Sequence, residues 1–247
     1  MLKTRIIPVM LLKNDYFVKT LRFDNPEYVG DPINIVRIFN DKGADELTIF
    51  DIDVSTLKKE INYKLIEDIA INARMPLCYG GGISNKEQAK KIFSIGVEKI
   101  AISKGYFEDK KIIKVLSKQF GSQSIAVTLN INTFDNNSYL INDTVYSKEC
   151  DFKSIIKEIS QEGAGEIIIN CIHRDGTNSG YDIKLIDMIY PHATTPLTFV
   201  GGANSYDHIL ELAKKYPLLG LGAGNLFIYK GKNKAVLISY PSEHSER

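Results

Sequence analysis

Residues 42–49 have the sequence KGADELTI, and residues 162–169 have the sequence EGAGEIII. The two stretches match with a shift of 120 residues, and the same shift places Gly81 on Gly201. This shift is about half of the 247-residue chain, which is too long for the repeat of a solenoid. The sequence therefore predicts two fused copies of one half-domain.

Each copy alternates short apolar runs with amphipathic stretches, whose apolar residues have helical spacing. The runs are rich in Ile, Val, Leu and Phe without polar alternation, as is typical of parallel strands buried on both faces. Eight strands alternating with helices, in two repeated halves, predict an α/β fold of the (β/α)8 TIM barrel type. An open doubly wound sheet is the alternative, which the repeat disfavours. The strand-like runs lie near residues 5–11, 46–52, 76–80, 98–103, 123–130, 165–171, 196–200 and 218–222.

We expect a single domain over residues 1–247, because no linker-like stretch divides the chain. Its repeated halves are about 1–120 and 121–238. The residues that follow, 239–247, have the composition of a short polar tail.

Composition excludes several classes of protein. The 31 Lys and Arg residues balance 30 Asp and Glu residues, and a net charge of +1 argues against a nucleic-acid binder. No apolar run approaches the ~18 residues of a membrane span, and the first residues lack the pattern of a signal peptide. Cys78, Cys150 and Cys171 are too dispersed for a disulfide framework or a zinc ribbon, and we expect them in the core. A cytoplasmic protein without membrane contact follows as the expectation.

Glycines gather where a barrel of this type binds ligands, which is at the carboxyl ends of the strands. Glycine lets the backbone approach an anion, and a helix that starts nearby offers free N–H groups. The loops after strands 7 and 8 form the usual phosphate site of such barrels, and the repeat predicts a second site after strands 3 and 4. The alternative is that these glycines only form tight turns. The candidate phosphate-binding residues are Gly81, Gly82, Ser103, Lys104, Thr177, Gly201, Gly202, Gly222, Ala223 and Gly224.

Candidate acid–base groups also follow strands. Asp51 ends strand 2, and Asp175 lies at the equivalent position after strand 6, with His173 two residues before it. Side chains of these types exchange protons in many active sites, although they equally serve to orient loops. Strands 1 and 5 end in Leu11 and Asn130, neither of which exchanges a proton. His192, His208 and His244 lack the spacing of metal ligands, so we expect no metal and no cofactor.

Several blocks in order resemble the cyclase subunit of imidazole glycerol phosphate synthase, and the resemblance covers nearly the whole chain. These blocks are residues 5–8 (RIIP), 30–32 (GDP), 43–47 (GADEL), 80–83 (GGGI), 120–123 (FGSQ), 163–166 (GAGE) and 174–182 (RDGTNSGYD). The resemblance implies a (β/α)8 barrel that receives ammonia from a glutaminase partner at the amino-terminal face of the barrel. It implies that ammonia crosses the barrel to a phosphorylated small-molecule ligand at the carboxyl-terminal face.

The resemblance further implies a gate of four charged residues at the bottom of the barrel. The matching positions are Arg5, Glu46, Lys99 and Glu166, although an ordinary salt-bridge cluster explains them equally well from the sequence alone. Glu98 and Gln123 lie on the same face, where we expect contacts with the glutaminase.

The match fails at the two catalytic positions. The family uses aspartates as general acid and base at the ends of strands 1 and 5, where this chain has Leu11 and Asn130. Losing general acid–base catalysis costs about 10²–10⁴-fold per group. Lys104 also replaces a small polar residue of the family's anion site.

We therefore expect a diverged relative that retains the barrel, the anion loops and the gate. The resemblance implies that such paralogues supply ammonia to a separate amidotransferase, which acts on a nucleotide sugar in bacterial surface-polysaccharide (lipopolysaccharide) pathways. One alternative is a genuine cyclase (lyase) of histidine biosynthesis that uses Asp51, Asp175 or His173. Another is a non-catalytic scaffold that activates the glutaminase.

Overall fold

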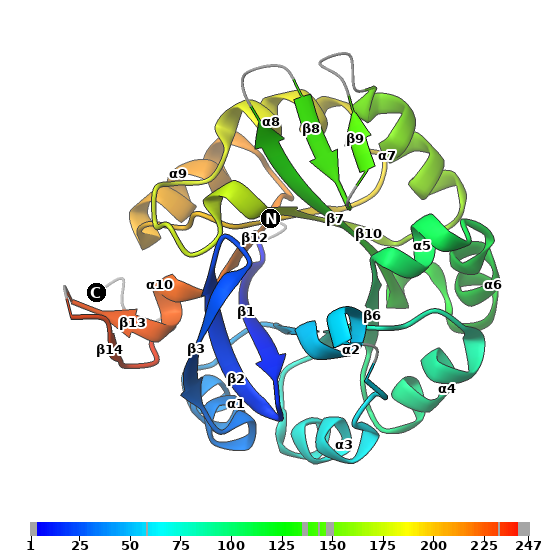
Figure 1. Ribbon diagram of the computed structural model, residues 1–247. Coiled ribbons are helices and arrows are strands. Elements are labelled where there is room, and N and C mark those ends of the chain that lie inside the picture. The colour runs from blue at the N-terminus through cyan, green and yellow to red at the C-terminus, as the bar shows by residue number, and fades with distance from the viewer. Residues whose placement is uncertain are drawn as a thin grey trace.

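Eight parallel strands close into a barrel in the computed structural model, which describes residues 4–57, 59–134, 138–142, 144–146, 151–231 and 233–241. Each strand pairs with the next, and the pairing of β12 with β1 closes the ring. The predicted (β/α)8 barrel is therefore confirmed, and the open sheet is wrong (Figure 1). The barrel strands are β1 (Ile6–Lys13), β4 (Leu47–Asp51), β5 (Leu77–Gly80), β6 (Lys99–Ile102), β7 (Ile125–Phe134), β10 (Glu166–Cys171), β11 (Leu197–Val200) and β12 (Gly220–Ala223).

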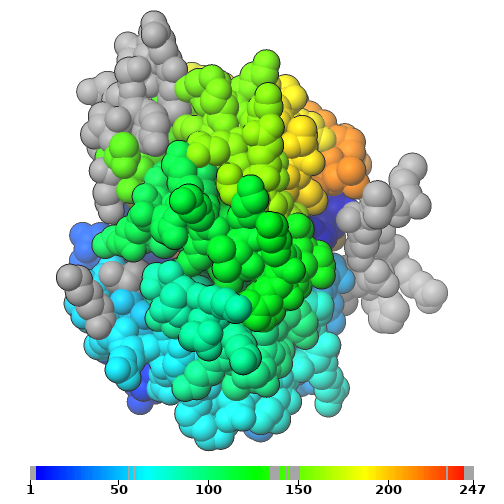
Figure 2. Space-filling model, turned by 90° about the vertical axis from the view of Figure 1, so that its right-hand side faces the viewer, coloured from blue at the N-terminus to red at the C-terminus, as the bar shows by residue number. Residues whose placement is uncertain are grey.

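Helices surround the strands, as Figure 1 shows along the barrel axis. Figure 2 shows one side of the closed outer surface, with the green segments of the middle of the chain facing the viewer. Most begin at a side chain that accepts a hydrogen bond from a free N–H of the first turn, such as Asp31 at α1. The helices are α1 (Pro32–Asp41), α2 (Ile52–Leu57), α3 (Tyr63–Asn72), α4 (Lys86–Ser94), α5 (Lys104–Glu108), α6 (Lys111–Phe120), α7 (Phe152–Gln161), α8 (Ile183–Ile189), α9 (Tyr206–Lys215) and α10 (Asn225–Ile228), with 3-10 turns at Ser122–Ser124, Ile172–Arg174 and Tyr190–His192. No helix among these described residues is long and apolar enough to span a bilayer.

Short strands extend the barrel at its carboxyl-terminal face, and the sequence analysis did not predict them. β2 (Tyr16–Leu21) and β3 (Asp24–Gly30) form a hairpin that continues β1. β8 (Ser138–Ile141) and β9 (Thr144–Tyr146) continue β7 in the same way. A third pair, β13 (Tyr229–Lys230) and β14 (Ala235–Val236), lies near the carboxyl end of the chain.

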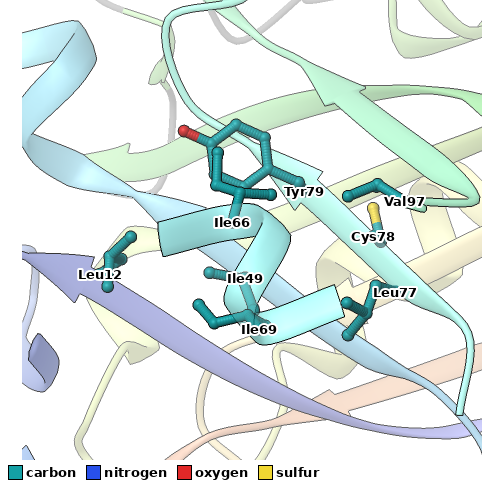
Figure 3. Close-up of a pocket in the computed structure, with 8 residues that line it drawn as sticks. All are labelled: Leu12, Ile49, Ile66, Ile69, Leu77, Cys78, Tyr79 and Val97. Atoms are coloured by element: carbon teal, nitrogen blue, oxygen red, sulfur yellow. The ribbon is translucent and has the colours of Figure 1, made fainter. Parts of the chain in front are cut away.

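Two apolar clusters form the core. The larger packs between strands and helices, and the smaller fills the barrel interior with side chains such as Ile7, Val9 and Ala126. A small apolar cavity between the strands and α3 is a packing gap, lined by Ile66 and Ile69 of that helix (Figure 3). Cys78 and Cys171 are buried, as expected, whereas Cys150 lies outside the described residues.

The described end of the chain contacts the bottom of the barrel. The Tyr240 hydroxyl donates to the Ile6 carbonyl oxygen at 2.9 Å and contacts Asp45 Oδ2 at 3.1 Å. Its ring packs against Phe227. The first residues of the expected polar tail therefore pack on the domain, and residues 242–247 lie outside the described part.

Candidate functional site

Four charged side chains form a closed ring at the amino-terminal end of the barrel. Lys99 Nζ lies 3.0 Å from Glu46 Oε1 and 2.6 Å from Glu166 Oε2. Arg5 contacts the same two carboxylates, at 3.1 Å from Glu46 and 2.9 Å from Glu166. The structure thus brings together all four predicted gate residues, with positive and negative charges alternating.

Burial makes this ring electrostatically strong. Burial alone would raise the pKa of Glu166, but the charges of Lys99 and Arg5 and their hydrogen bonds lower it to about 2. Burial likewise opposes ionisation of Arg5 and Lys99, yet their carboxylate partners raise both pKa values above the ordinary ones. Arg5, Lys99 and Glu166 therefore stay ionised at neutral pH. Thr198 also donates to Glu166 Oε1, at 2.5 Å.

The two expected partner contacts lie at strand starts on this same face. Glu98 precedes β6, and its carboxylate accepts a hydrogen bond from the Leu77 N–H at 2.8 Å. Gln123 is exposed in the 3-10 turn before β7.

A cavity opens at the opposite, carboxyl-terminal end, where the glycine loops after β11 and β12 meet the β2–β3 hairpin. A Cβ atom at Gly202 would lie 2.2 Å from the Gly180 carbonyl oxygen, so only glycine fits there. Among the predicted anion-binding residues, this cavity gathers those of loops 7 and 8. Its lining comprises Val9, Leu11, Lys19, Phe23, Asn170, Asp175, Gly176, Asn178, Val200, Gly201, Gly202, Ala203, Gly222, Ala223, Gly224 and Asn225.

Lys19 is the principal cavity residue that the sequence analysis missed. It extends from β2, is only 6% exposed, and donates to the Val9 carbonyl oxygen. Burial lowers its pKa to about 8, partly opposed by the charge of Asp175. The ammonium group lies against loop 8, because a Cβ atom at Gly224 would lie 2.5 Å from Nζ. The sequence signal for β2, the strand that carries Lys19, was the Asn14-Asp15 turn between two apolar runs, which joins β1 to β2.

Asp175 holds the β2–β3 hairpin against loop 6. Its Oδ2 accepts from the Thr20 hydroxyl at 2.6 Å and from the Phe23 N–H at 3.2 Å, and its carbonyl oxygen accepts from the Arg22 N–H at 3.0 Å. Burial raises the pKa of this carboxyl, although these hydrogen bonds and Lys19 oppose the shift. Asp175 therefore lines the cavity while it anchors the hairpin.

The other two candidate acid–base groups, Asp51 and His173, also form hydrogen bonds within the fold. Asp51 Oδ1 accepts from the N–H groups of Asp53 and Val54 at the start of α2, and Oδ2 accepts from the Tyr79 hydroxyl at 3.3 Å. Burial raises the pKa of Asp51, partly offset by these hydrogen bonds. His173 Nε2 lies 3.0 Å from Asp182 Oδ2, and its buried Nδ1 has no partner among the described residues. Neither residue lines the cavity described above.

Leu11 and Asn130, the two departures from the family pattern, lie within β1 and β7 rather than at their ends, because both strands continue into short hairpins, to Lys13 and Phe134. Leu11 lines the cavity as an apolar side chain. Asn130 Nδ2 donates to Ser103 Oγ at 3.2 Å, and its Oδ1 accepts from Asn170 Nδ2 at 3.3 Å. Neither position supplies an ionisable group.

The candidate anion residues after β5 and β6 do not line this cavity, unlike the equivalent residues after β11 and β12. Ser103 Oγ donates to the Thr128 carbonyl oxygen at 3.1 Å and accepts from two asparagine side chains. The Lys104 side chain is 67% exposed and lies 3.8 Å from Glu108. Gly81 and Gly82 have positive φ angles, of 140° and 65°. Thr177, in loop 6, donates to the Arg174 carbonyl oxygen at 2.8 Å.

Within the described part of the chain, no group of three His, Cys, Asp or Glu residues is placed to hold a metal ion. His244, one of the histidines considered above, lies outside that part. At the carboxyl-terminal face, the described residues supply backbone N–H groups, the buried Lys19 ammonium group, amides, hydroxyls, the His173 imidazole and hydrogen-bonded carboxylates.

The fold defines a TIM-barrel protein with a charged ring at one end of the barrel and a glycine-lined cavity at the other. The model of the "Histidine biosynthesis protein" family matches residues 5–234. A relative from Leptospira borgpetersenii, provisionally named imidazole glycerol phosphate synthase subunit HisF, is 46% identical over 98% of this chain and 96% of its own length. A Vibrio vulnificus relative, provisionally named subunit hisF3 of that enzyme, is 46% identical over the whole chain and 96% of its own length.

The chain belongs to the HisF family of imidazole glycerol phosphate synthase subunits. Streptococcus mutans imidazole glycerol phosphate synthase subunit HisF, named without qualification, is 31% identical over 93% of this chain and 92% of its own length. The chain is thus more similar to the provisionally named relatives, which is consistent with a diverged paralogue. Members of this family pair with a glutaminase subunit, HisH.

Proposed function

We propose that this chain is the ammonia-receiving synthase subunit of a cytoplasmic glutamine amidotransferase, and that it has lost the cyclase activity of its family. The observation that carries the proposal is the contrast between the two ends of the barrel. The charged ring is complete at the amino-terminal end. At the other end, Leu11 and Asn130 stand where the family has its two catalytic aspartates.

The amino-terminal face then serves as the docking face of a HisH-like glutaminase, with Glu98 and Gln123 among its contacts. Ammonia enters at the ring of Arg5, Glu46, Lys99 and Glu166 and crosses the barrel interior. That interior is lined by small and apolar side chains such as Ala101 and Ala126, whose methyl groups form no hydrogen bonds that would hold a passing neutral molecule. This apolar lining supports the passage of ammonia, because its side chains include no acid that would protonate ammonia and so hold it as ammonium.

At the carboxyl-terminal face, the glycines of loops 7 and 8 hold a phosphorylated ligand through backbone N–H groups. Lys19 adds a cation beside Gly224. Asp175 keeps this lysine in place by anchoring the hairpin that carries it.

The ammonia is delivered to a separate amidotransferase that amidates a nucleotide sugar for surface polysaccharide. A barrel that receives ammonia but lacks an acid–base pair needs another protein to use it, and this supports an external acceptor. Asp51, Asp175 and His173 are poor substitutes for the missing aspartates, because each already has a hydrogen-bonding role in the fold.

The test is a reconstituted assay with the purified glutaminase partner. We expect the chain to stimulate glutamine hydrolysis, while no imidazole product forms from the bisphosphate substrate of the histidine pathway and ammonia. Product formation at the rate of a HisF from the same organism would refute the loss of cyclase activity. Absence of glutaminase stimulation would refute the ammonia role. A Lys99→Met variant should uncouple glutamine hydrolysis from ammonia delivery, with Lys118→Met on the outside of α6 as the matched control.

A further inference from the structure

The repeat predicts two equivalent anion sites at the carboxyl-terminal face, but the two halves of this face differ in chemistry. The half formed by loops 6–8 has a cavity and a buried cation, Lys19. The half formed by loops 3–5 has neutral amides and a hydroxyl that already satisfy one another. The difference bears directly on which ligand the site accepts.

Ser103 is the centre of the second half, and its hydroxyl has no hydrogen-bonding capacity to spare. A serine hydroxyl donates one hydrogen bond and accepts two. Ser103 Oγ donates to the Thr128 carbonyl oxygen at 3.1 Å, and it accepts from Asn130 Nδ2 at 3.2 Å and from Asn142 Nδ2 at 2.9 Å. A phosphate oxygen here would have to displace one of these partners.

Asn142 fixes this arrangement from the turn between β8 and β9. Its Oδ1 accepts from the Asn130 N–H at 2.6 Å, and its own N–H donates to the Asn130 carbonyl oxygen at 3.0 Å. Its φ angle of 44° is tolerated by asparagine better than by most residues. Asn142 thus occupies the Asn130 N–H and, together with Asn130 and Thr128, saturates the Ser103 hydroxyl.

The cluster reaches the cavity through Asn170. This residue lines the cavity and donates through Nδ2 to Asn130 Oδ1 at 3.3 Å. Lys104, in loop 4, does not add a buried positive charge to this half of the face, because its side chain is 67% exposed and lies near Glu108. The face therefore presents a cationic end at loops 6–8 and a neutral amide end at loops 3–5.

We infer that this site takes a phosphate monoester whose phosphate lies at loops 6–8, beside Lys19, and whose other end is uncharged and polar and faces Asn170. This inference rests on the anion site proposed above and narrows its ligand class, because a bisphosphate would place a second dianion against a saturated neutral cluster. The apolar side chains of Leu11 and Phe23 also line the cavity, and they would contact the carbon portion of this ligand.

Calorimetric titration of the full chain with ribulose 5-phosphate and ribulose 1,5-bisphosphate tests the inference, because the two probes differ by one phosphate. We expect one bound molecule of either probe and affinities that differ by less than about tenfold. Lys19→Met should weaken both by about tenfold or more, whereas the matched Lys118→Met, on the exposed side of α6, should change neither by more than about twofold. Thermal unfolding confirms that each variant folds.

A second variant tests the cluster independently of Lys19. Asn142→Gly keeps the positive φ and removes the side chain that occupies Ser103. We expect it to favour the bisphosphate over the monophosphate by about fivefold more than the wild type does. A wild-type preference for the bisphosphate above about tenfold would overturn the inference, as would no binding of either probe. Glutaminase stimulation by the same preparations tests the ammonia role separately, so the two failures are distinguishable.

Discussion

Replacing Glu166 by glutamine tests whether the charged ring has the electrostatic strength that its geometry implies. Glu166 is 4% exposed and accepts hydrogen bonds from Arg5, Lys99 and Thr198. Glutamine is nearly isosteric, but it removes the charge and presents an N–H group to neighbours that are themselves donors. Two half-buried cations, Arg5 and Lys99, then share the single carboxylate of Glu46.

The size of the effect follows from the pKa of Glu166. The value is lowered from 4.5 to about 2, which corresponds to roughly 3 kcal/mol of preferential stabilisation of the ionised folded state. Breaking a buried ion pair by removing one partner costs about 3–5 kcal/mol, which is of the same size. We therefore expect Glu166→Gln to lower the free energy of unfolding at pH 7 by about 3 kcal/mol.

The sign of the pH dependence is fixed by the direction of the shift. Because the folded-state pKa lies below the unfolded value, the stabilisation is complete above about pH 4.5 and is lost as the pH falls toward 2. The difference in stability between wild type and Glu166→Gln should thus fall to less than half of its neutral value by about pH 3.

Urea unfolding from pH 7 to pH 3, followed by circular dichroism, measures this difference without the ionic screening of guanidinium. Glu211→Gln, on the exposed face of α9, is the matched control and should change stability by less than about 0.5 kcal/mol. A loss below about 1 kcal/mol at pH 7, or one that is equal at pH 3 and pH 7, would refute the reasoning.

Four further outcomes are expected. Asp175→Ala should release the β2–β3 hairpin, so that its amides exchange hydrogen about tenfold faster, measured by mass spectrometry. Phosphate affinity should decline above about pH 8, because Lys19 loses its proton there, and calorimetry of Lys19→Met should show no such decline. Tyr240→Phe should lower the free energy of unfolding in urea by about 1 kcal/mol. Leu11→Asp combined with Asn130→Asp should partly restore cyclisation, measured as imidazole product from the bisphosphate substrate and ammonia.

Matched variants make these outcomes specific. Asp207→Ala, on the exposed side of α9, should leave the rate of amide hydrogen exchange in the β2–β3 hairpin unchanged. The same rate in Asp175→Ala as in the wild type would contradict the anchoring role of Asp175. Tyr28→Phe removes a hydroxyl from a side chain that is 63% exposed, so an equal loss there would show that the contacts of Tyr240 are unimportant. Leu11→Asn adds polarity without an acid, and restored activity in that variant would contradict the need for a carboxylate.

The barrel was predictable because its information is local and repeated. Strands buried on both faces need continuous apolar runs, and the two halves repeat them at the same spacing. The ring was predictable from residue types at strand starts once the resemblance was stated. Whether Arg5 and Lys99 contact the same carboxylates is a matter of geometry, and the structure settles it at 2.6–3.1 Å.

The β2–β3 hairpin was not predictable, because its tight turn depends on a distant residue. Arg22 and Phe23 adopt φ angles of 53° and 66°, a conformation that usually calls for glycine or asparagine. Their N–H groups bond to Asp175, which compensates for this cost. Lys19 is buried only because the turn folds in this way, so its role depends on a contact that the sequence pattern does not encode.

The ring also bears on function, because stability alone does not account for it. Replacing a buried ion pair by well-packed apolar side chains often leaves the stability of a protein unchanged or raises it by about 1–4 kcal/mol. A barrel bottom that only had to fold would be served equally well by such residues, as its own interior around Ala126 and Ile168 shows. A ring of charges provides a polar constriction that apolar packing does not. The proposed passage of a small polar molecule through the barrel would account for such a constriction, whether or not Leu11 and Asn130 have ended the chemistry at the other face.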